Sequence, residues 1–200
     1  MASIIYKENL FGNDKKNSII HWLTCKKYKK GINNDGSIIK REQLWFQKDQ
    51  LPFNKKWEKF DRWCSEKIYE EILYDIENHI NIKSYGIELN INSCLINKYE
   101  DGRDFIKFHN DSYEAFGENH YIILVSFGET RTLRFRDKTN KENYFDKILK
   151  DNSLLIVFPD INMKYEHSIL KDDTKNKRYS LTFRNYITKD KYQIQSHPVE

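Results

Sequence analysis

The sequence lacks the features that would assign it to a membrane, secreted or cysteine-rich class of protein. It contains no run of about eighteen or more apolar residues, the length that a membrane-spanning helix needs. Its first residues show no basic segment followed by an apolar one, so no secretory signal is expected. Its three cysteines are odd in number and have no CxxC spacing, which indicates neither a disulfide framework nor a zinc site. We therefore expect an intracellular protein, in the cytoplasm or the nucleus, with no membrane partner.

Neither sign of charge dominates, and no repeat or low-complexity linker divides the chain. The formal net charge is +4 over 200 residues, which favours an anionic partner only weakly. With 38% hydrophobic residues, a chain of this length can bury one core without disulfides. We therefore expect a monomer with one domain over residues 1–200, in which 1–86 contain helices and 87–190 form a β-rich core.

Hydrophobic periodicity predicts two helices in the N-terminal part. Residues 15–30 place apolar side chains near helical spacing, and Gly31 is the expected stop. From about 61 to 80, apolar residues recur every four or five positions and glutamates occupy the other faces, which is typical of an amphipathic helix. The stretch from 31 to about 60 mixes turn-forming residues with aromatics and charges, which favours strand and loop.

Short segments rich in β-branched and aromatic residues follow Gly86 and predict five strands. They span 87–99, 121–127, 131–136, 153–158 and 178–187. Polar turns separate them, as in antiparallel sheets. The pattern predicts an α+β fold in which helices precede a β core. Its strands fit a double-stranded β-helix, a form of jelly roll, or a sandwich, and the polar residues on them favour the former.

Polar side chains share single faces of two predicted strands. Because side chains alternate along a strand, Asn97 and Tyr99 lie on one face of the first. In the segment RYSLTFR, Arg178 and Arg184 share a face with two hydroxyl side chains, while apolar residues occupy the other. Turning two arginines inward is costly unless an anion binds there. Since the planar guanidinium binds carboxylates through two hydrogen bonds, the sequence predicts a carboxylate site.

Three further residues suggest a metal centre. His109 and Asp111 are two positions apart, so both side chains can point to one ion, and His167 follows a later predicted strand. Two imidazoles and one carboxylate on one side of a metal form the ligand set of non-haem Fe(II) oxygenases. An HxD pair arises readily by chance in a chain with six histidines, and a lone histidine is usually a hydrogen-bonded surface or core residue. The inward arginines nearby favour the iron site.

These residues lie in segments that resemble the AlkB family of Fe(II)- and 2-oxoglutarate-dependent dioxygenases. The similarity runs from about 91 to 187 through INSCLINKYEDGRDFIKFHND, LVSFGETRTLRFR, SLLIVF, EHSI and RYSLTFR. The double-arginine ending makes it specific, and SFGETRTLRFR most resembles the branch that repairs alkylated nucleic acid. The resemblance implies Fe(II), with 2-oxoglutarate and O2 as cosubstrates. It also implies demethylation of N-alkylated bases in DNA or RNA, with release of formaldehyde, succinate and CO2.

The resemblance assigns roles to the polar residues. It implies three iron ligands, which are His109, Asp111 and His167. Arg178 would pair with the distal carboxylate of 2-oxoglutarate, assisted by Tyr99 and Asn97. Arg184 would lie near the proximal carboxylate or hold Asp111 in place.

A base that is demethylated must leave its stack and lie between flat side chains. The resemblance places His109 at one wall and an aromatic residue from a nucleotide-recognition lid, which REQLWF weakly resembles, at the other. Residues expected to contact substrate are Arg41, Trp45, Phe46, Phe53, Tyr113, Glu114 and Arg131. The aromatic residues could instead fill the core beneath the helices.

Two features bear on which substrate is used. Relatives in the repair branch have an acidic residue at the position of Tyr113, with Glu114 its neighbour here, so the resemblance does not imply a particular base. Arg131, Arg134 and Arg136 form either a strand that contacts the nucleic-acid backbone or a solvated strand face. The alternatives are a 2-oxoglutarate-dependent hydroxylase or demethylase of protein side chains or small molecules, and a non-catalytic binding module.

Overall fold

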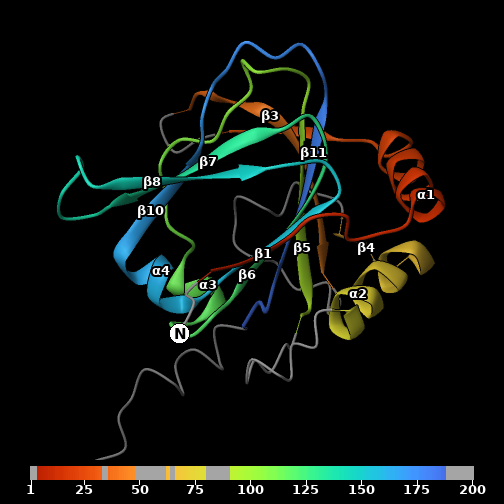
Figure 1. The fold of residues 1–200 in the computed structure, drawn as a ribbon, viewed down its shortest axis with the longest axis horizontal. Helices are drawn as coiled ribbons and strands as arrows, with labels where there is room; N and C mark the ends of the chain where they lie inside the picture. The colour runs from red at the N-terminus through yellow and green to blue at the C-terminus, as the bar shows by residue number, and fades with distance from the viewer. Residues whose placement is uncertain (1–3, 33–35, 48–61, 64–65, 80–90, 188–200) are drawn as a thin grey trace, which may run out of the picture.

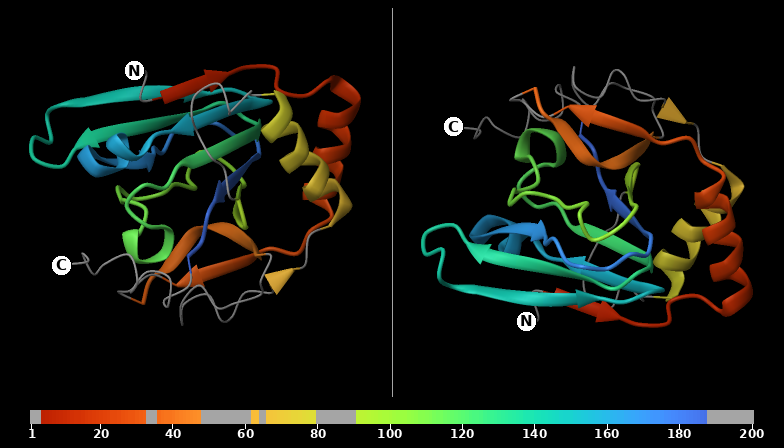
Figure 2. Two further views of the ribbon diagram at one scale, coloured as in Figure 1. Left: turned by 90° about the horizontal axis from the view of Figure 1, so that it is seen from below. Right: turned by 90° about the horizontal axis from the view of Figure 1, so that it is seen from above.

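The computed structural model describes residues 4–32, 36–47, 62–63, 66–79 and 91–187. They form two mainly antiparallel β-sheets that face each other, with α1 (Asn13–Thr24) and α2 (Lys67–His79) packed against the outer face of the larger sheet (Figure 1 and Figure 2). No helix in these described stretches has the length and apolar character needed to cross a membrane.

The larger sheet has eight strands and the smaller has three. Along the larger sheet the order is β1 (Ile4–Lys7), β9 (Ser153–Val157), β6 (Ile122–Gly128), β11 (Arg178–Arg184), β5 (Ser93–Tyr99), β3 (Ile38–Gln47) and β2 (Lys29–Ile32), and β4 (Arg62–Trp63) pairs with β3. The smaller sheet has the order β10 (Tyr165–Ile169), β7 (Arg131–Asp137) and β8 (Tyr144–Leu149). Two short helices, α3 (Tyr113–Phe116) and α4 (Pro159–Lys164), lie in the connections before β6 and β10.

Both faces of the larger sheet are buried, because successive side chains on each strand pack on opposite sides. On β6, Ile123 and Val125 pack in the same cluster as Ile19 of α1 and Ile76 of α2. Leu124, between them in the chain, packs toward the smaller sheet in a second cluster. The space between the sheets is therefore a second core, and the polar residues described below lie within it.

Both predicted helices are present but shorter than predicted. α1 ends at Thr24, and Gly31, the expected stop, lies in β2, which pairs with β3. α2 begins at Lys67, and β4, which fell inside the predicted helix, pairs with β3. In both places strand pairing replaces a further helical turn, and local periodicity cannot reveal such tertiary pairing.

All five predicted strands are present, but the expectation that helices precede the β core is wrong in part. β1, β2 and β3 come from the N-terminal third and join the larger sheet, where β1 pairs with β9 and β3 pairs with β5. β3 lies in the stretch from 31 to about 60 for which strand and loop were expected, whereas β1, β8 and β10 were not predicted. β10 reads YEHSI, a segment too short and too polar to show the alternation of a half-buried strand.

β11 carries the polar face that the sequence predicted. It lies between β5 and β6, and all seven of its residues are buried. Its register places Arg178 opposite Tyr99 and Ser180 opposite Asn97 on β5. This row of side chains, which continues to Arg184, lies on the face of the larger sheet that is turned toward the smaller one.

Candidate metal centre and anion pocket

His109, Asp111 and His167 come together at one end of the space between the sheets. One potential ligand atom from each lies within 4.8 Å of the others. His167 belongs to β10, and His109 follows β5, yet their main chains form a two-way bridge. The amide of His109 donates to the carbonyl of His167 at 3.0 Å, and the amide of His167 donates back at 2.8 Å. The structure therefore assembles the predicted triad in a geometry that could hold one metal ion.

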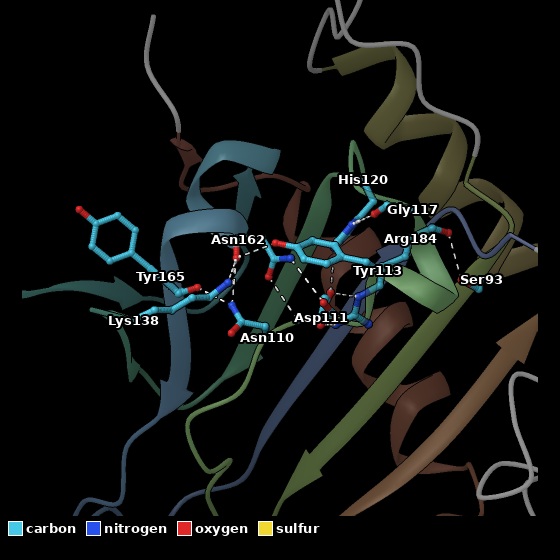
Figure 3. Close-up of polar contacts among 10 residues, drawn as sticks. All are labelled: Ser93, Asn110, Asp111, Tyr113, Gly117, His120, Lys138, Asn162, Tyr165 and Arg184. Atoms are coloured by element: carbon cyan, nitrogen blue, oxygen red, sulfur yellow. Dashed lines mark hydrogen bonds and ion pairs between the residues drawn. The ribbon is translucent and has the colours of Figure 1, made fainter. Parts of the chain in front are cut away.

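Arg184 holds the carboxylate of Asp111. Its Nε and Nη2 donate to the two carboxylate oxygens, the latter at 2.9 Å, and both residues are buried (Figure 3). Burial alone would raise the pKa of Asp111, but the charge of Arg184 and the nearby His167 outweigh it and lower the pKa below its ordinary value. Asp111 is therefore ionised at neutral pH. Of the two roles predicted for Arg184, this geometry matches the one in which it holds Asp111.

Both histidines of the triad are in the form that can bind a metal. Burial lowers the pKa of His109, and burial with the neighbouring His109 lowers the pKa of His167 to about 3. The imidazoles are therefore neutral at pH 7. The Nδ1 of His109 lies 2.9 Å from the carbonyl of Lys107, so in the tautomer that donates this bond Nε2 keeps its lone pair for an ion.

Arg178 is a buried cation with unused donors. Its side chain is fully buried, and Nη2 donates to the hydroxyl of Ser126 at 2.9 Å. Its Nε and Nη1 have no hydrogen-bond partner among the described residues, nor does the buried hydroxyl of Tyr99, whose ring centre lies 5.1 Å from the guanidinium. Leaving such groups unpaired is costly, so they fit the carboxylate of a bound anion such as 2-oxoglutarate.

A cavity between the sheets extends from the histidines along β5 and β11. Its walls include His109, His167 and Arg184, the polar Asn97, and several apolar side chains of β6, β7 and β9. The side-chain oxygen of Asn97 accepts hydrogen bonds from Arg41 Nε at 2.7 Å and Gln43 Nε2 at 3.2 Å. Arg41 also lines the cavity, so this candidate for substrate contact does lie beside the triad.

The structure does not support a substrate role for Arg131. Its side chain is 1% exposed, and its Nη2 donates to the carbonyls of Asp104, at 2.8 Å, and Leu170, while Nε pairs with Asp172 at 2.7 Å. Arg131 therefore connects the loop that contains Asp104 with the loop that contains Leu170 and Asp172. The idea that Arg131, Arg134 and Arg136 form one surface is wrong, because Arg131 is three positions from Arg134 and so lies on the opposite face of β7.

The aromatic residues expected in a lid are buried on β3. Phe46 packs between Trp22 and Tyr69 with ring centres 5.8 and 5.3 Å away, so it fills the core beneath the helices, and its predicted substrate role is wrong. Trp45 is on the opposite face, 2% exposed, in a cluster with Phe116 near the cavity. Phe53 lies outside the described residues.

Tyr113 and Glu114 begin α3, which starts two residues after the triad aspartate. Tyr113 is half-buried, and its hydroxyl lies 3.4 Å from the carbonyl of Asn162, which accepts a weak hydrogen bond. Glu114 is exposed on the same short helix, and its contact with substrate stays a prediction. Two polar residues near the triad were not predicted, Asn162 and His120, because neither belongs to a motif. The Nε2 of His120 lies 3.8 Å from Asp111 Oδ2, and Nδ1 lies 2.6 Å from the carbonyl of Gly117.

The sequence of residues 8–184 matches the 2OG-Fe(II) oxygenase superfamily, and the chain belongs to this family. The family specifies Fe(II), 2-oxoglutarate and O2 as cofactor and cosubstrates, which agrees with the triad and the unpaired Arg178. The predicted membership of an AlkB-like group is confirmed by curated relatives.

Three of these relatives match over about half of the chain. Protein R406 of Acanthamoeba polyphaga mimivirus is 34% identical over 102 residues, which are 50% of this chain and 51% of R406. Alpha-ketoglutarate-dependent dioxygenase alkB homolog 3 of Rattus norvegicus is 31% identical, over 46% of this chain and 35% of the relative. DNA oxidative demethylase ALKBH2 of Mus musculus is 31% identical, over 48% and 44%. The matched region thus spans about half the length of these relatives or less.

The fold is that of solved structures of the same kind. The structure of OsALKBH1 superposes with a TM-score of 0.71 at 13% identity, covering 92% of this chain and 99% of that one. At this identity the likeness concerns the fold alone. It confirms the predicted double-stranded β-helix core.

Proposed function

We propose that this protein is an Fe(II)- and 2-oxoglutarate-dependent dioxygenase that demethylates N-alkylated bases in DNA or RNA. The observation that carries the proposal is the pairing of two sites in one space. Two histidines of the His-Asp-His triad line a cavity between the sheets together with Tyr99, and the buried, partly unpaired guanidinium of Arg178 lies 5.1 Å from the ring centre of Tyr99. The names of two relatives, a DNA oxidative demethylase and an alkB homolog, favour an alkylated nucleic acid as substrate.

Each polar residue has a defined role in this proposal. His109, Asp111 and His167 would bind the iron, and Arg178 with Tyr99 would bind the distal carboxylate of 2-oxoglutarate. When bound, the iron and 2-oxoglutarate supply an oxidising centre that can hydroxylate a C–H bond. The apolar walls contributed by β6, β7 and β9 exclude water from this centre.

Hydroxylation of an N-methyl group would leave an unstable carbinolamine that releases formaldehyde and restores the base. In the same reaction 2-oxoglutarate is converted to succinate and CO2. One atom of the O2 enters the succinate, and the other enters the hydroxyl group of the substrate. Arg41 and Tyr113, which are partly exposed near the triad, remain candidates for contact with the substrate, as does the exposed Glu114.

Mass spectrometry of a mixed panel of methylated DNA and RNA oligonucleotides tests the proposal. Incubation with Fe(II), 2-oxoglutarate and O2 should remove methyl groups and release formaldehyde in equal amount. The variant His109→Ala should fold and show no turnover. Turnover of 2-oxoglutarate without demethylation of any oligonucleotide would contradict the nucleic-acid substrate and favour a protein or small molecule.

A further inference from the structure

Asn162 is a buried residue of α4 whose side chain contacts the main chain of Asp111. It is 1% exposed. Its Oδ1 accepts the amide hydrogen of Asp111 at 3.2 Å, and its Nδ2 donates to the carbonyl of Asp111 at 3.5 Å (Figure 3). The side-chain amide thus meets both polar groups of one peptide residue, as a neighbouring strand would.

The same arrangement occurs twice elsewhere in the described residues. Asn152 accepts from the amide of Phe11 at 3.0 Å and donates to its carbonyl at 2.8 Å. Asn92 accepts from the amide of Tyr186 at 2.6 Å and donates to its carbonyl at 2.7 Å. These two pairs connect segments that are distant in the sequence. Of the three asparagines, Asn162 alone meets a residue of the triad.

Asp111 needs a contact of this kind because the strand pairing stops short of it. The main-chain bridge between His109 and His167 sets the positions of both imidazoles. Asp111 lies two residues beyond the bridge. Arg184 holds its carboxylate from β11, and Asn162 holds its main chain from the other direction. The short segment 162–167 therefore forms hydrogen bonds with the main chain of both His109 and Asp111.

The main chain of Asn162 adds to this connection. Its carbonyl accepts hydrogen bonds from the Nδ2 of Asn110 at 3.0 Å and the Nζ of Lys138 at 2.9 Å. The hydroxyl of Tyr113 lies 3.4 Å from the same oxygen. Asn110, just before Asp111, and Tyr113, two residues after it, thus also contact α4.

We propose that Asn162 is a positioning residue for the metal centre, which fixes the main chain of Asp111 so that its carboxylate meets the metal together with both imidazoles. This inference rests on the ligand assignment made above and is independent of the substrate. Groups that orient metal ligands typically change metal affinity by about 10- to 100-fold when they are removed.

Binding of Co(II) alone to the full chain, measured by calorimetry, tests the inference without turnover. Asn162→Ala should weaken Co(II) binding by about 10- to 100-fold. Asn162→Ser creates a smaller cavity than Asn162→Ala and keeps a polar group. It should also weaken Co(II) binding, and it replaces the alanine variant in the experiment if that variant does not fold. Affinity within about twofold of the wild type in a folded variant of either kind would overturn the inference.

Asn152→Ala is the matched control, since it removes the same pair of hydrogen bonds from Phe11. It should lower the melting temperature and leave Co(II) affinity unchanged. If it weakened Co(II) binding as much as Asn162→Ala, the effect would be a general loss of stability, and the inference would be wrong.

A double-variant comparison separates Asp111 from the rest of the site. In an Asp111→Ala background, where two imidazoles remain, Asn162→Ala should cause no further loss of Co(II) affinity, because the group that it positions is absent. An equal loss in both backgrounds would contradict the inference. If His109→Ala and His167→Ala kept wild-type affinity, the ligand assignment itself would be wrong. If they lost it while Asn162→Ala did not, only the role of Asn162 would fail.

Discussion

Arg178 is the residue whose environment most needs a ligand. Replacing it with methionine keeps much of the volume and removes the buried charge with its two unpaired nitrogens. We expect Arg178→Met to weaken 2-oxoglutarate binding at least about 100-fold and to leave the unliganded protein as stable or more stable, because an uncompensated buried charge is unfavourable. Calorimetric titration and thermal unfolding measure the two effects.

The control for this variant is Arg134→Met, which removes an arginine that pairs with Asp146 at 2.7 Å on an exposed part of β7. It should leave 2-oxoglutarate affinity unchanged and should change the free energy of unfolding by no more than about 1 kcal/mol. Unchanged 2-oxoglutarate affinity in Arg178→Met would show that the buried guanidinium does not bind the cosubstrate.

The ion pair of Arg184 and Asp111 should dominate the response of this site to mutation and acid. Arg184→Ala leaves a buried carboxylate unpaired and should cost about 3–5 kcal/mol of unfolding free energy, measured with urea. Because the pKa of Asp111 is lowered in the folded protein, its contribution is present above the unfolded pKa of about 4 and is lost as the pH falls further. The difference between wild type and variant should therefore shrink in acid. A difference that stayed constant to pH 2 would contradict this assignment.

Residue spacing predicted some of these positions and not others. Arg178 and Arg184 are six positions apart on one strand, so alternation alone placed them on one face, and the register confirms it. The same rule applied to Arg131 would have placed it opposite Arg134. The contact of Asn162 with Asp111 joins residues that are distant in sequence, so no local pattern could reveal it.

At the scale of elements, the loops that follow β5 and β10 lie so close together that position 102 has no room for a side chain. A Cβ atom there would lie 2.2 Å from the carbonyl oxygen of Asp172. Gly102→Ala should force the two loops apart and lower the unfolding free energy by about 1–3 kcal/mol, as overpacking does. Urea unfolding measures it. Gly12→Ala, with no atom within 4 Å of the new Cβ, is the control, and an equal loss there would contradict the steric explanation.

Elements were predictable where a segment carries its own periodicity. α2 and β6 are confirmed because their apolar residues recur at helical or strand spacing. β10 was not predicted, although it carries His167, because its strand form depends on pairing with β7. The helix ends were wrong for the same reason, since β2 and β4 gain partners only in the folded sheet.

At the scale of the molecule, the two faces of the larger sheet are covered by different elements. α1 and α2 pack against one face, and the smaller sheet encloses the polar site on the other. With a net charge of +4, the protein has little general attraction for nucleic acid, so binding should depend on local phosphate contacts.

Oligonucleotide affinity should therefore fall as salt is raised from 50 to 200 mM, by about tenfold if two phosphates are contacted. Fluorescence anisotropy of a labelled methylated oligonucleotide measures this dependence. An unmethylated oligonucleotide of the same sequence separates backbone contacts from recognition of the base. Absence of binding at low salt would speak against a nucleic-acid substrate.

The bridge between His109 and His167 lies outside the regular ladders, as an isolated pair of main-chain hydrogen bonds. A metal held by both side chains would cross-link the same two segments a second time, so local opening of the chain and loss of the metal become one event. Chelation should speed hydrogen exchange at the amides of His109 and His167 and leave the β5–β11 amides unchanged. Equal exchange with and without metal would separate the two processes. The hydrogen-exchange rates of these two amides would then show whether the metal is bound at the oxidising centre.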